Sequence, residues 1–291
     1  MFAKLPPMIT EVILVDGGSK DRTVEVAREL RPDVVVVQQT RIGKGNALAC
    51  GFAACTGDII VMIDADGSTD PAEIPLFVAK LTGGDQFVKG TRFNFGGHSH
   101  DITRLRKLGN DGLNLVVNVL FKTKFTDLCY GYNAFWRDVV PALDLPAVEL
   151  PRPADGSKLW GDGFEIETMI NIRAVAEQLK VGEVGSTEHE RIHGQSNLNT
   201  FRDGFRVLRT IFSEFGRARS RRKAGVELFA VKLAKQTAAR QATNASGPHP
   251  VDPRGHVNRA ARTAQDINKP RHSAVDDLGN QPTRDLRSRQ K

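Results

Sequence analysis

The chain has 291 residues, of which 40% are hydrophobic, and a formal net charge of +7 at pH 7. This length and composition predict a globular protein of one or two domains with a core of ordinary size. No run of about 18 apolar residues is present, so we expect no transmembrane helix. The first residues lack the apolar segment of a signal peptide, and the three cysteines have no zinc-type spacing. These features predict a reduced, cytoplasmic protein.

The positive charge is concentrated towards the C-terminus. Residues 235–291 carry 11 Lys and Arg against 5 Asp and Glu, a net charge of +6, so the rest of the chain is nearly neutral. Residues 236–291 have few large apolar side chains, and such a segment cannot bury enough surface to fold. A basic cluster precedes it at 217–223. We therefore expect a folded domain over residues 1–216 and a basic, disordered tail over 217–291.

Strand and helix patterns alternate in the first third of the chain. Strands are predicted over 11–16, 34–37, 59–63 and 86–90, and helices over 21–30, 43–55 and 70–81. This alternation predicts an α/β fold with a mostly parallel sheet flanked by helices. Further on we expect helices over 105–121, 162–179 and 201–215, a strand over 181–189, a loop over 145–157, and a short strand or turn at 135–136.

Two acids follow the apolar run 59–63. Asp64 and Asp66 are separated by one residue, so at a strand end they project towards the same side. The carboxyl ends of strands in open α/β sheets are where ligands bind. Two close carboxylates repel each other unless a cation lies between them, and Mg²⁺ or Mn²⁺ fits because it also takes phosphate oxygens. An acidic turn explains the residues equally well, since Asp, Gly and Ser favour turns.

Several short motifs resemble family 2 glycosyltransferases of the GT-A fold, and most closely the dolichol-phosphate mannose synthase-like branch. They are VDGGSKDRT at 15–23, GKGNA at 43–47, DAD at 64–66, GTR at 90–92, TDLCYGYNAF at 126–135 and RIHGQSNL at 191–198. Each motif alone is a weak signal. Together, in this order over residues 8–215, they favour the metal interpretation of Asp64 and Asp66 over the turn.

The resemblance implies roles on the donor side of the reaction. Asp16 would lie against the base or ribose of a GDP- or UDP-sugar, and Lys44 would approach the donor. Asp64 and Asp66 would hold Mg²⁺ or Mn²⁺ on the diphosphate. A helix charge in contact with solvent is the alternative for Lys44, and a turn cap is the alternative for Asp16.

The resemblance also implies an acceptor side and a closing loop. Arg92 and Arg106 would face an acceptor phosphate, and Arg106 could otherwise be a solvated helix charge. Arg191, with Ser196, would lie on a loop over the donor phosphates, where a planar guanidinium matches phosphate oxygens.

The implied reaction is an inverting sugar transfer, in which the metal and Arg191 stabilise charge on the leaving diphosphate. Asp66 and Arg191 would thus be catalytic. A polyprenyl phosphate acceptor is already an anion and needs no base, whereas a hydroxyl acceptor needs one. Asp162 and Glu165 are the candidates for that base. They could instead stabilise the start of the helix that follows.

Two departures from the family pattern stand out. The family's opening strand is not found, and residues 1–7 look like the end of the helix that follows it. We therefore expect an N-terminally truncated sequence, with a gap between the strands on either side and unpaired backbone groups there. Ser68 stands where mannose-phosphate synthases usually carry an amide, which leaves the sugar and the acceptor open.

Helix 201–215 combines apolar residues at helical spacing with arginines beside them. This pattern suits an interfacial helix on an anionic membrane, here the inner face, and equally a helix packed on the core. A different class of function is a non-catalytic protein whose basic tail binds nucleic acid or acidic partners without specificity. Nucleotidyl transfer is disfavoured, since the glycine-rich loop of those enzymes is absent.

Overall fold

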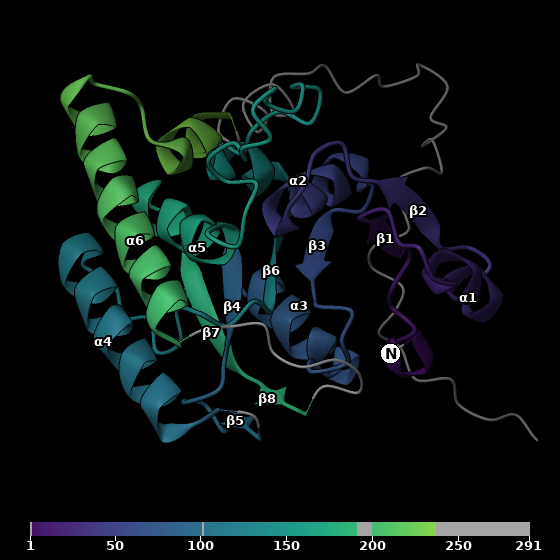
Figure 1. Ribbon diagram of the computed structural model, residues 1–291. Coiled ribbons are helices and arrows are strands. Elements are labelled where there is room, and N and C mark those ends of the chain that lie inside the picture. The colour runs from purple at the N-terminus through teal and green to yellow at the C-terminus, as the bar shows by residue number, and fades with distance from the viewer. Residues whose placement is uncertain (1, 101, 191–199, 237–291) are drawn as a thin grey trace, which may run out of the picture. The chain divides into compact units, whose positions relative to one another are not determined.

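A computed structural model describes residues 2–100, 102–190 and 200–236 (Figure 1). These residues belong to one compact unit, Met1–Ala239, and the second unit, Arg240–Lys291, lies outside the described residues. Arg191 and Ser196 also lie outside them. Among the described helices, none has both the length and the apolar character needed to span a bilayer.

The strands form a parallel pair, a four-stranded sheet and a small outer pair. Strand β1 (Ile13–Asp16) lies parallel to β2 (Val35–Gln38). The four-stranded sheet has the order β3-β6-β4-β7, and the small pair is β5-β8. The bounds are Ile59–Met62 for β3, Phe87–Thr91 for β4, His98–Ser99 for β5, Asn133–Trp136 for β6, Val181–Gly185 for β7 and Thr187–Glu188 for β8.

Strand β6 is antiparallel to both of its neighbours, whereas β4 and β7 are parallel. The sequence left this segment as a short strand or turn, and the structure makes it an inner strand of the sheet. The expected α/β class is confirmed, with one reversed strand inserted in the sheet.

Helices cover the sheets on both sides (Figure 1). They are α1 (Thr23–Leu30), α2 (Lys44–Ala54), α3 (Ile74–Thr82), α4 (Arg104–Phe121), α5 (Ile166–Ala176) and α6 (Thr200–Lys223), with short 3₁₀ helices η1 (Phe2–Lys4), η2 (Pro71–Glu73) and η3 (Arg137–Leu143). Asp70 caps the start of η2, and its carboxylate accepts from the N–H of Ala72. Pro71 is the first residue of this helix, a position that suits proline.

The main core joins the sheet to α2 and α5. Phe87 and Phe135 are cross-strand partners whose rings stack with centroids 5.4 Å apart, and Phe52 of α2 meets Phe135 edge-on at 5.3 Å. Ile166 and Ile170 of α5 complete this cluster. Such aromatic pairs stabilise beyond the area they bury.

Helix α6 continues beyond residue 216 to Lys223, past the position where the sequence analysis ends the folded domain. Glu214 forms a buried ion pair with Arg173 of α5 at 2.9 Å, and Arg221 pairs with Glu177 at 3.1 Å. Residues 229–236 are again helical, and Phe229 packs against the main core. The basic cluster does not end the fold because its charges find acidic partners and an apolar residue follows it.

A buried ion pair connects the loop before α2 to the segment before α5. Arg41 donates from Nε and Nη2 to the two carboxylate oxygens of Asp162, at 2.7 and 2.9 Å, and each side chain is 1% exposed. Nη1 of Arg41 also donates to the carbonyls of Ala147 and Leu150. One guanidinium therefore organises the loop that the sequence left without secondary structure.

Two glycines allow the backbones to meet at this ion pair. The N–H of Gly45 donates to the carbonyl of Asp162 at 2.8 Å. A Cβ at Gly45 would lie 1.8 Å from the carbonyl oxygen of Gly161, and one at Gly43 would lie 2.1 Å from that of Asp162. Gly43 also has φ of 134°, a conformation open chiefly to glycine. The first turn of α2 is thereby fixed against this segment.

We predict that Asp162→Asn lowers the free energy of unfolding by about 3 kcal/mol, because it leaves the Arg41 guanidinium buried without its counter-charge. Urea denaturation measures the change. Asp155→Asn is the control, since Asp155 is exposed in the preceding loop and should shift stability by less than about 0.5 kcal/mol. Equal stability of the two variants would show that the ion pair does not hold these segments together.

Candidate active site

A cavity of about 650 Å³ lies beyond the C-terminal end of β3. Its walls come from the loop after β3, the start of α2, the segment before β6, and helices α5 and α6. Lys44, Asp64, Asp66, Ser68, Glu167 and Arg202 are among the residues that line it. The structure therefore brings together four of the expected site residues, Lys44, Asp64, Asp66 and Arg92.

Lys44 bridges two carboxylates in this cavity. Its Nζ lies 2.7 Å from Oδ1 of Asp64 and also donates to Glu167. Burial of the ammonium opposes its charge, but the carboxylates of Glu167 and Asp64 outweigh that effect and raise the pKa of Lys44. Lys44 is therefore charged at neutral pH, and it is not a helix charge in contact with solvent, because its side chain is 18% exposed.

Asp66 is held in a tight turn. One of its carboxylate oxygens accepts from the N–H of Ser68 at 3.0 Å and from the Ser68 hydroxyl at 2.7 Å. Ser68 is buried, so this turn fixes where the Asp66 carboxylate can lie. Asp66 both forms this turn and lines the cavity. The turn interpretation and the metal interpretation of the motif are therefore compatible.

Asp64 and Asp66 suit Mg²⁺ or Mn²⁺ in part. Both offer hard carboxylate oxygens to one cavity, which is the donor chemistry that such ions take. Within the described residues, no group of three or more His, Cys, Asp and Glu is arranged to hold a metal. The residues present therefore fit an ion that takes its remaining ligands from water and from the phosphates of a bound ligand.

Asp16 ends β1 and caps the turn that follows. Its carboxylate accepts from the N–H groups of Gly18 and Ser19, both at 3.1 Å, and from the amide of Gln38 at 2.9 Å. Hydrogen bonds from Ser19 and Gln38 lower the pKa of Asp16 to about 2. Asp16 is not among the residues that line the cavity. The contacts present match the turn-cap alternative.

Arg92 lines the cavity, but its guanidinium is committed to acidic partners. It donates to Asp127 at 2.7 and 2.9 Å and to Glu188 at 2.9 Å, and it lies over the ring of Tyr130. Its side chain is 10% exposed. Burial opposes the charge of Arg92, but Asp127 and Glu188 raise its pKa above the ordinary value.

The structure does not bring Arg106, Asp162 or Glu165 into the cavity lining. Arg106 belongs to the first turn of α4. Asp162 is paired with Arg41, as described above. Glu165 accepts from the N–H of Gly161 at 2.9 Å and of Gly163 at 3.0 Å. The expected choice of Asp162 or Glu165 as a base is therefore not supported, because both carboxylates hold the turn before α5.

Six charged residues of the cavity lining were missed as site residues: Lys158, Glu167, Glu188, Arg202, Asp203 and Arg206. Glu167 lies two residues after Glu165, on the first turn of α5, and contacts Lys44. Arg202 and Arg206 of α6 and Lys158 add three cations. The sequence identified the arginines only as charges beside an apolar helix face. Helical phase does not single out Glu167 in the sequence, because α5 is buried on nearly all sides.

Comparisons with known proteins agree on one family. Residues 2–143 match the model of "Glycosyl transferase family 2". Glycosyltransferase AglJ of Haloferax volcanii is 31% identical over 195 residues, which are 66% of this chain and 59% of that protein. A dolichol-phosphate mannosyltransferase of Pyrococcus furiosus is 29% identical, over 69% of this chain and 54% of that protein. The chain thus spans little more than half of these curated relatives.

Solved structures of the glucosyl-3-phosphoglycerate synthase of Mycobacterium tuberculosis share the fold. The complex with phosphoglyceric acid superposes with a TM-score of 0.53 at 25% identity, covering 72% of this chain and 70% of that chain. The complex with Mn²⁺, UDP and glucosyl-3-phosphoglycerate gives 0.52 at 25% identity, with the same coverage. This likeness confirms the expected GT-A architecture, and the curated relatives are consistent with the dolichol-phosphate mannose synthase-like branch. Residues 2–143 of the chain thus match a glycosyl transferase family 2 domain, and the curated relatives agree with that family.

Proposed function

We propose that this chain transfers a sugar, with inversion, from a nucleoside-diphosphate sugar to a polyprenyl phosphate. The observation that carries the proposal is one cavity that combines the carboxylates of Asp64 and Asp66 with the cations of Lys44, Arg202 and Arg206. A diphosphate and an acceptor phosphate are both anions, and both need such cations.

The donor side of the proposal uses the end of β3. Asp64 and Asp66 would hold Mg²⁺ or Mn²⁺, which would neutralise charge on the leaving diphosphate. Lys44 would add a fixed positive charge beside them. Crystals of the mycobacterial synthase contain UDP with Mn²⁺ or Mg²⁺, which supports testing a UDP-sugar first and a GDP-sugar second. Asp16 is proposed to contact the nucleoside, and Arg191 with Ser196 to close over the phosphates.

The acceptor side is proposed to lie at the start of α6. Arg202 and Arg206 line the cavity, and a guanidinium matches phosphate oxygens. Arg206 also pairs with Asp203 at 2.9 Å, so a phosphate would share it with that carboxylate. Arg92 would line the acceptor side, with its guanidinium still paired with Asp127 and Glu188. Arg106 is proposed to contact the acceptor from outside the cavity lining. A polyprenyl phosphate attacks with an oxygen that is already ionised, so no base is required.

An exposed apolar surface beside the cavity supports a lipid acceptor. Phe205 lies between Arg202 and Arg206 and is 71% exposed, and Phe212 is 54% exposed. Helix α4 packs on α6 and exposes Leu108 and Leu115. Buried Ile211 faces the core, so α6 both packs on the fold and offers aromatic side chains. We propose peripheral binding to an anionic membrane surface, at the cytoplasmic face.

A second candidate acceptor is the hydroxyl group of a small phosphorylated acid. The mycobacterial neighbours bind phosphoglyceric acid, and the same arginines would suit its charges. Glu167 would then be the base in place of Asp162 and Glu165. A non-catalytic protein is the remaining alternative, and it would bind no donor.

We predict that UDP-sugar with Mn²⁺ raises the melting temperature of the chain, because a ligand that binds only the folded state stabilises it. Asp66→Asn should weaken this binding at least about tenfold, or about 1.4 kcal/mol, as measured by calorimetry. Asp58→Asn, at the opposite end of β3, is the matched control. A donor panel that leaves the melting temperature unchanged would favour the non-catalytic alternative.

Glu167→Gln separates the two acceptors. With a polyprenyl phosphate, we expect the transfer rate to stay within about tenfold, since the acceptor brings its own negative charge. With a hydroxyl acceptor, loss of the base should reduce kcat by about 10²–10⁴-fold. Glu149→Gln, in an exposed loop, controls for loss of charge. Equal rates of Glu167→Gln and the wild type on 3-phosphoglycerate would remove Glu167 as a base.

The double change Phe205→Ser and Phe212→Ser should reduce flotation with anionic liposomes severalfold, because each buried aromatic ring adds apolar area in the interface. Leu30→Ser is the control, since Leu30 is 68% exposed on α1. Flotation of the double variant at the wild-type level would contradict membrane binding through α6.

A further inference from the structure

A lysine is buried in the four-stranded sheet, within reach of the chain that lines the candidate active site. Lys89 of β4 is 0% exposed and is among the largest fully buried side chains. Its register partners are Asn133 on β6 and Glu183 on β7, and Asn133 is also the partner of Met62 on β3. Residues that lie opposite each other in a sheet share a face. These four side chains therefore form one row across the sheet.

The row lies between the main core and the cavity. Phe87 is two residues before Lys89 and is therefore on the same face of β4. In the same way, Phe135 shares the face of Asn133 on β6. The rings of Phe87 and Phe135 pack in the main core with side chains of α5. On the other side, Asn133 directly follows Tyr132, which lines the cavity. The apolar core thus ends at a layer of polar groups beneath the cavity.

Burial of the Lys89 ammonium is costly, because the acid of its row is engaged elsewhere. The carboxylate of Glu183 accepts from the N–H of Thr126 at 2.9 Å and from its hydroxyl at 2.8 Å. Burial lowers the pKa of Lys89, against the opposing effect of Asp127 and Glu183. Lysines are almost never fully buried unless they are paired. The presence of Lys89 therefore points to a role other than stability.

The polar layer around Lys89 is incompletely satisfied. The Oδ1 atoms of Asn133 and Asn171 are buried and have no hydrogen-bond partner within the part of the chain that the structure describes. Buried polar groups without partners reduce stability. The layer is therefore not the arrangement that stability alone would favour.

The ammonium of Lys89 holds a backbone carbonyl. Its Nζ donates to the carbonyl oxygen of Tyr130, and among the described residues no other hydrogen-bond acceptor contacts it. Tyr130 belongs to segment 129–132, every residue of which lines the cavity. Lys89 itself is not part of the lining. It therefore fixes the backbone of a cavity wall from inside the sheet.

The residue after Tyr130 lies against the ion pair of the cavity. A Cβ at Gly131 would be 2.6 Å from Oε1 of Glu167 and 3.7 Å from Nζ of Lys44. The same oxygen of Glu167 is the one that Lys44 contacts. The peptide unit after Tyr130 thus has its carbonyl on Lys89 and its next Cα against the ion pair. The position of this peptide therefore limits where Glu167 and Lys44 can lie.

A second buried donor holds the chain just before this segment. Asn171 of α5 is 0% exposed, and its Nδ2 donates to the carbonyls of Leu128 at 3.1 Å and Glu167 at 2.7 Å. The chain before the segment is thus attached to α5, whereas the segment itself is attached to β4 through Lys89. Loss of the Lys89 contact would release the cavity wall and leave Leu128 attached.

We propose that Lys89 is a positioning residue for the donor site. By holding the carbonyl of Tyr130, it keeps segment 129–132 against the ion pair of Glu167 and Lys44. The inference rests on the proposed function, in which Lys44 supplies a positive charge to the donor diphosphate. The alternative is that Lys89 only supports the core, in which case its loss would change stability and leave the cavity wall in place.

The first test is alkylation of Cys129 by iodoacetamide in the full chain without ligand, followed by peptide mass spectrometry. Cys129 belongs to the segment. Burial and Asp127 raise the pKa of its thiol to about 12, whereas the charge of Lys89 lowers it. Lys89→Met removes that charge, so electrostatics alone would slow alkylation. Release of the segment should instead expose the thiol and speed alkylation at least about fivefold.

Two references accompany this test. Cys50 is buried in α2, and its alkylation should not change, which verifies that the variant is folded. Lys80→Met, at an exposed position of α3, is the matched control for the loss of a lysine and should leave Cys129 at the wild-type rate. Faster alkylation of both Cys50 and Cys129 in Lys89→Met would show a general loosening of the fold and would overturn the specific role of Lys89.

The second test is calorimetry of UDP with Mn²⁺. Lys89→Met should weaken binding about tenfold, as the loss of residues that orient ligands from outside does at metal sites. Lys89→Gln keeps an N–H donor on a side chain that is one atom shorter, so its values should lie between those of the wild type and Lys89→Met in both tests. If Lys89→Met does not fold, Lys89→Gln must still differ from the wild type in both tests.

Wild-type alkylation of Cys129 and wild-type UDP binding in the Lys89 variants would overturn the proposal. Faster alkylation with unchanged UDP binding would also overturn it, because the segment would then not position the donor site. If the wild type itself binds no UDP, the proposed function fails together with the donor-site role of Lys89, and alkylation then shows only whether Lys89 holds the segment.

Discussion

The buried ion pair between Arg41 and Asp162 is the constraint on which the candidate site depends. Neither charge is tolerated alone in a buried position, so the two segments that carry them are fixed together. Gly43 and Gly45 let the backbones meet at that point. As a result, Lys44 at the start of α2 is held beside the loop that follows β3, although the ion-paired residues are 121 positions apart.

The electrostatics of the cavity follow from that placement. Lys44 compensates the charges of Asp64 and Glu167, two carboxylates that come from distant segments. A divalent ion at Asp64 would therefore have to share or displace an existing ion pair. A phosphate-bearing ligand and its metal would add charges beside the ion pairs of Lys44. Binding of such a donor would therefore affect the position of Lys44.

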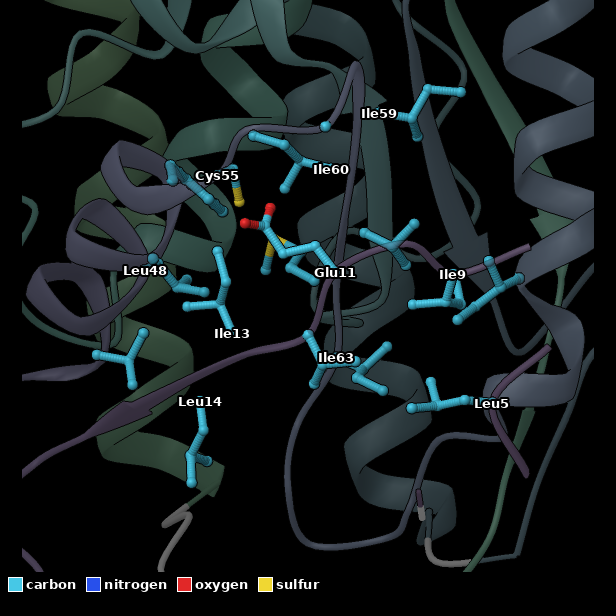
Figure 2. A pocket seen from close by; sticks show the side chains of 18 of the residues that line it. Leu5, Ile9, Glu11, Ile13, Leu14, Leu48, Cys55, Ile59, Ile60 and Ile63 are labelled. Carbon is cyan, nitrogen blue, oxygen red and sulfur yellow. The ribbon is translucent and has the colours of Figure 1, made fainter. Parts of the chain in front are cut away.

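An apolar groove of about 510 Å³ between β1 and β3 shares Lys44 and Asp64 with the candidate site (Figure 2). The loop that carries Asp64 follows directly after β3, and Lys44 closes the end of the groove.

The sequence by itself determined the local features: the strand and helix pattern, the motif at Asp64 and Asp66, the position of Lys44 at a helix start, and the family. These signals are local, because side-chain periodicity and turn residues act over a few positions. Only the tertiary structure decided that Asp162 and Glu165 hold a turn while Glu167 contacts Lys44. It also decided that α6 continues to Lys223. Each of these outcomes depends on which charged group of a distant segment contacts the side chain. The spacing of residues along the chain does not specify those contacts.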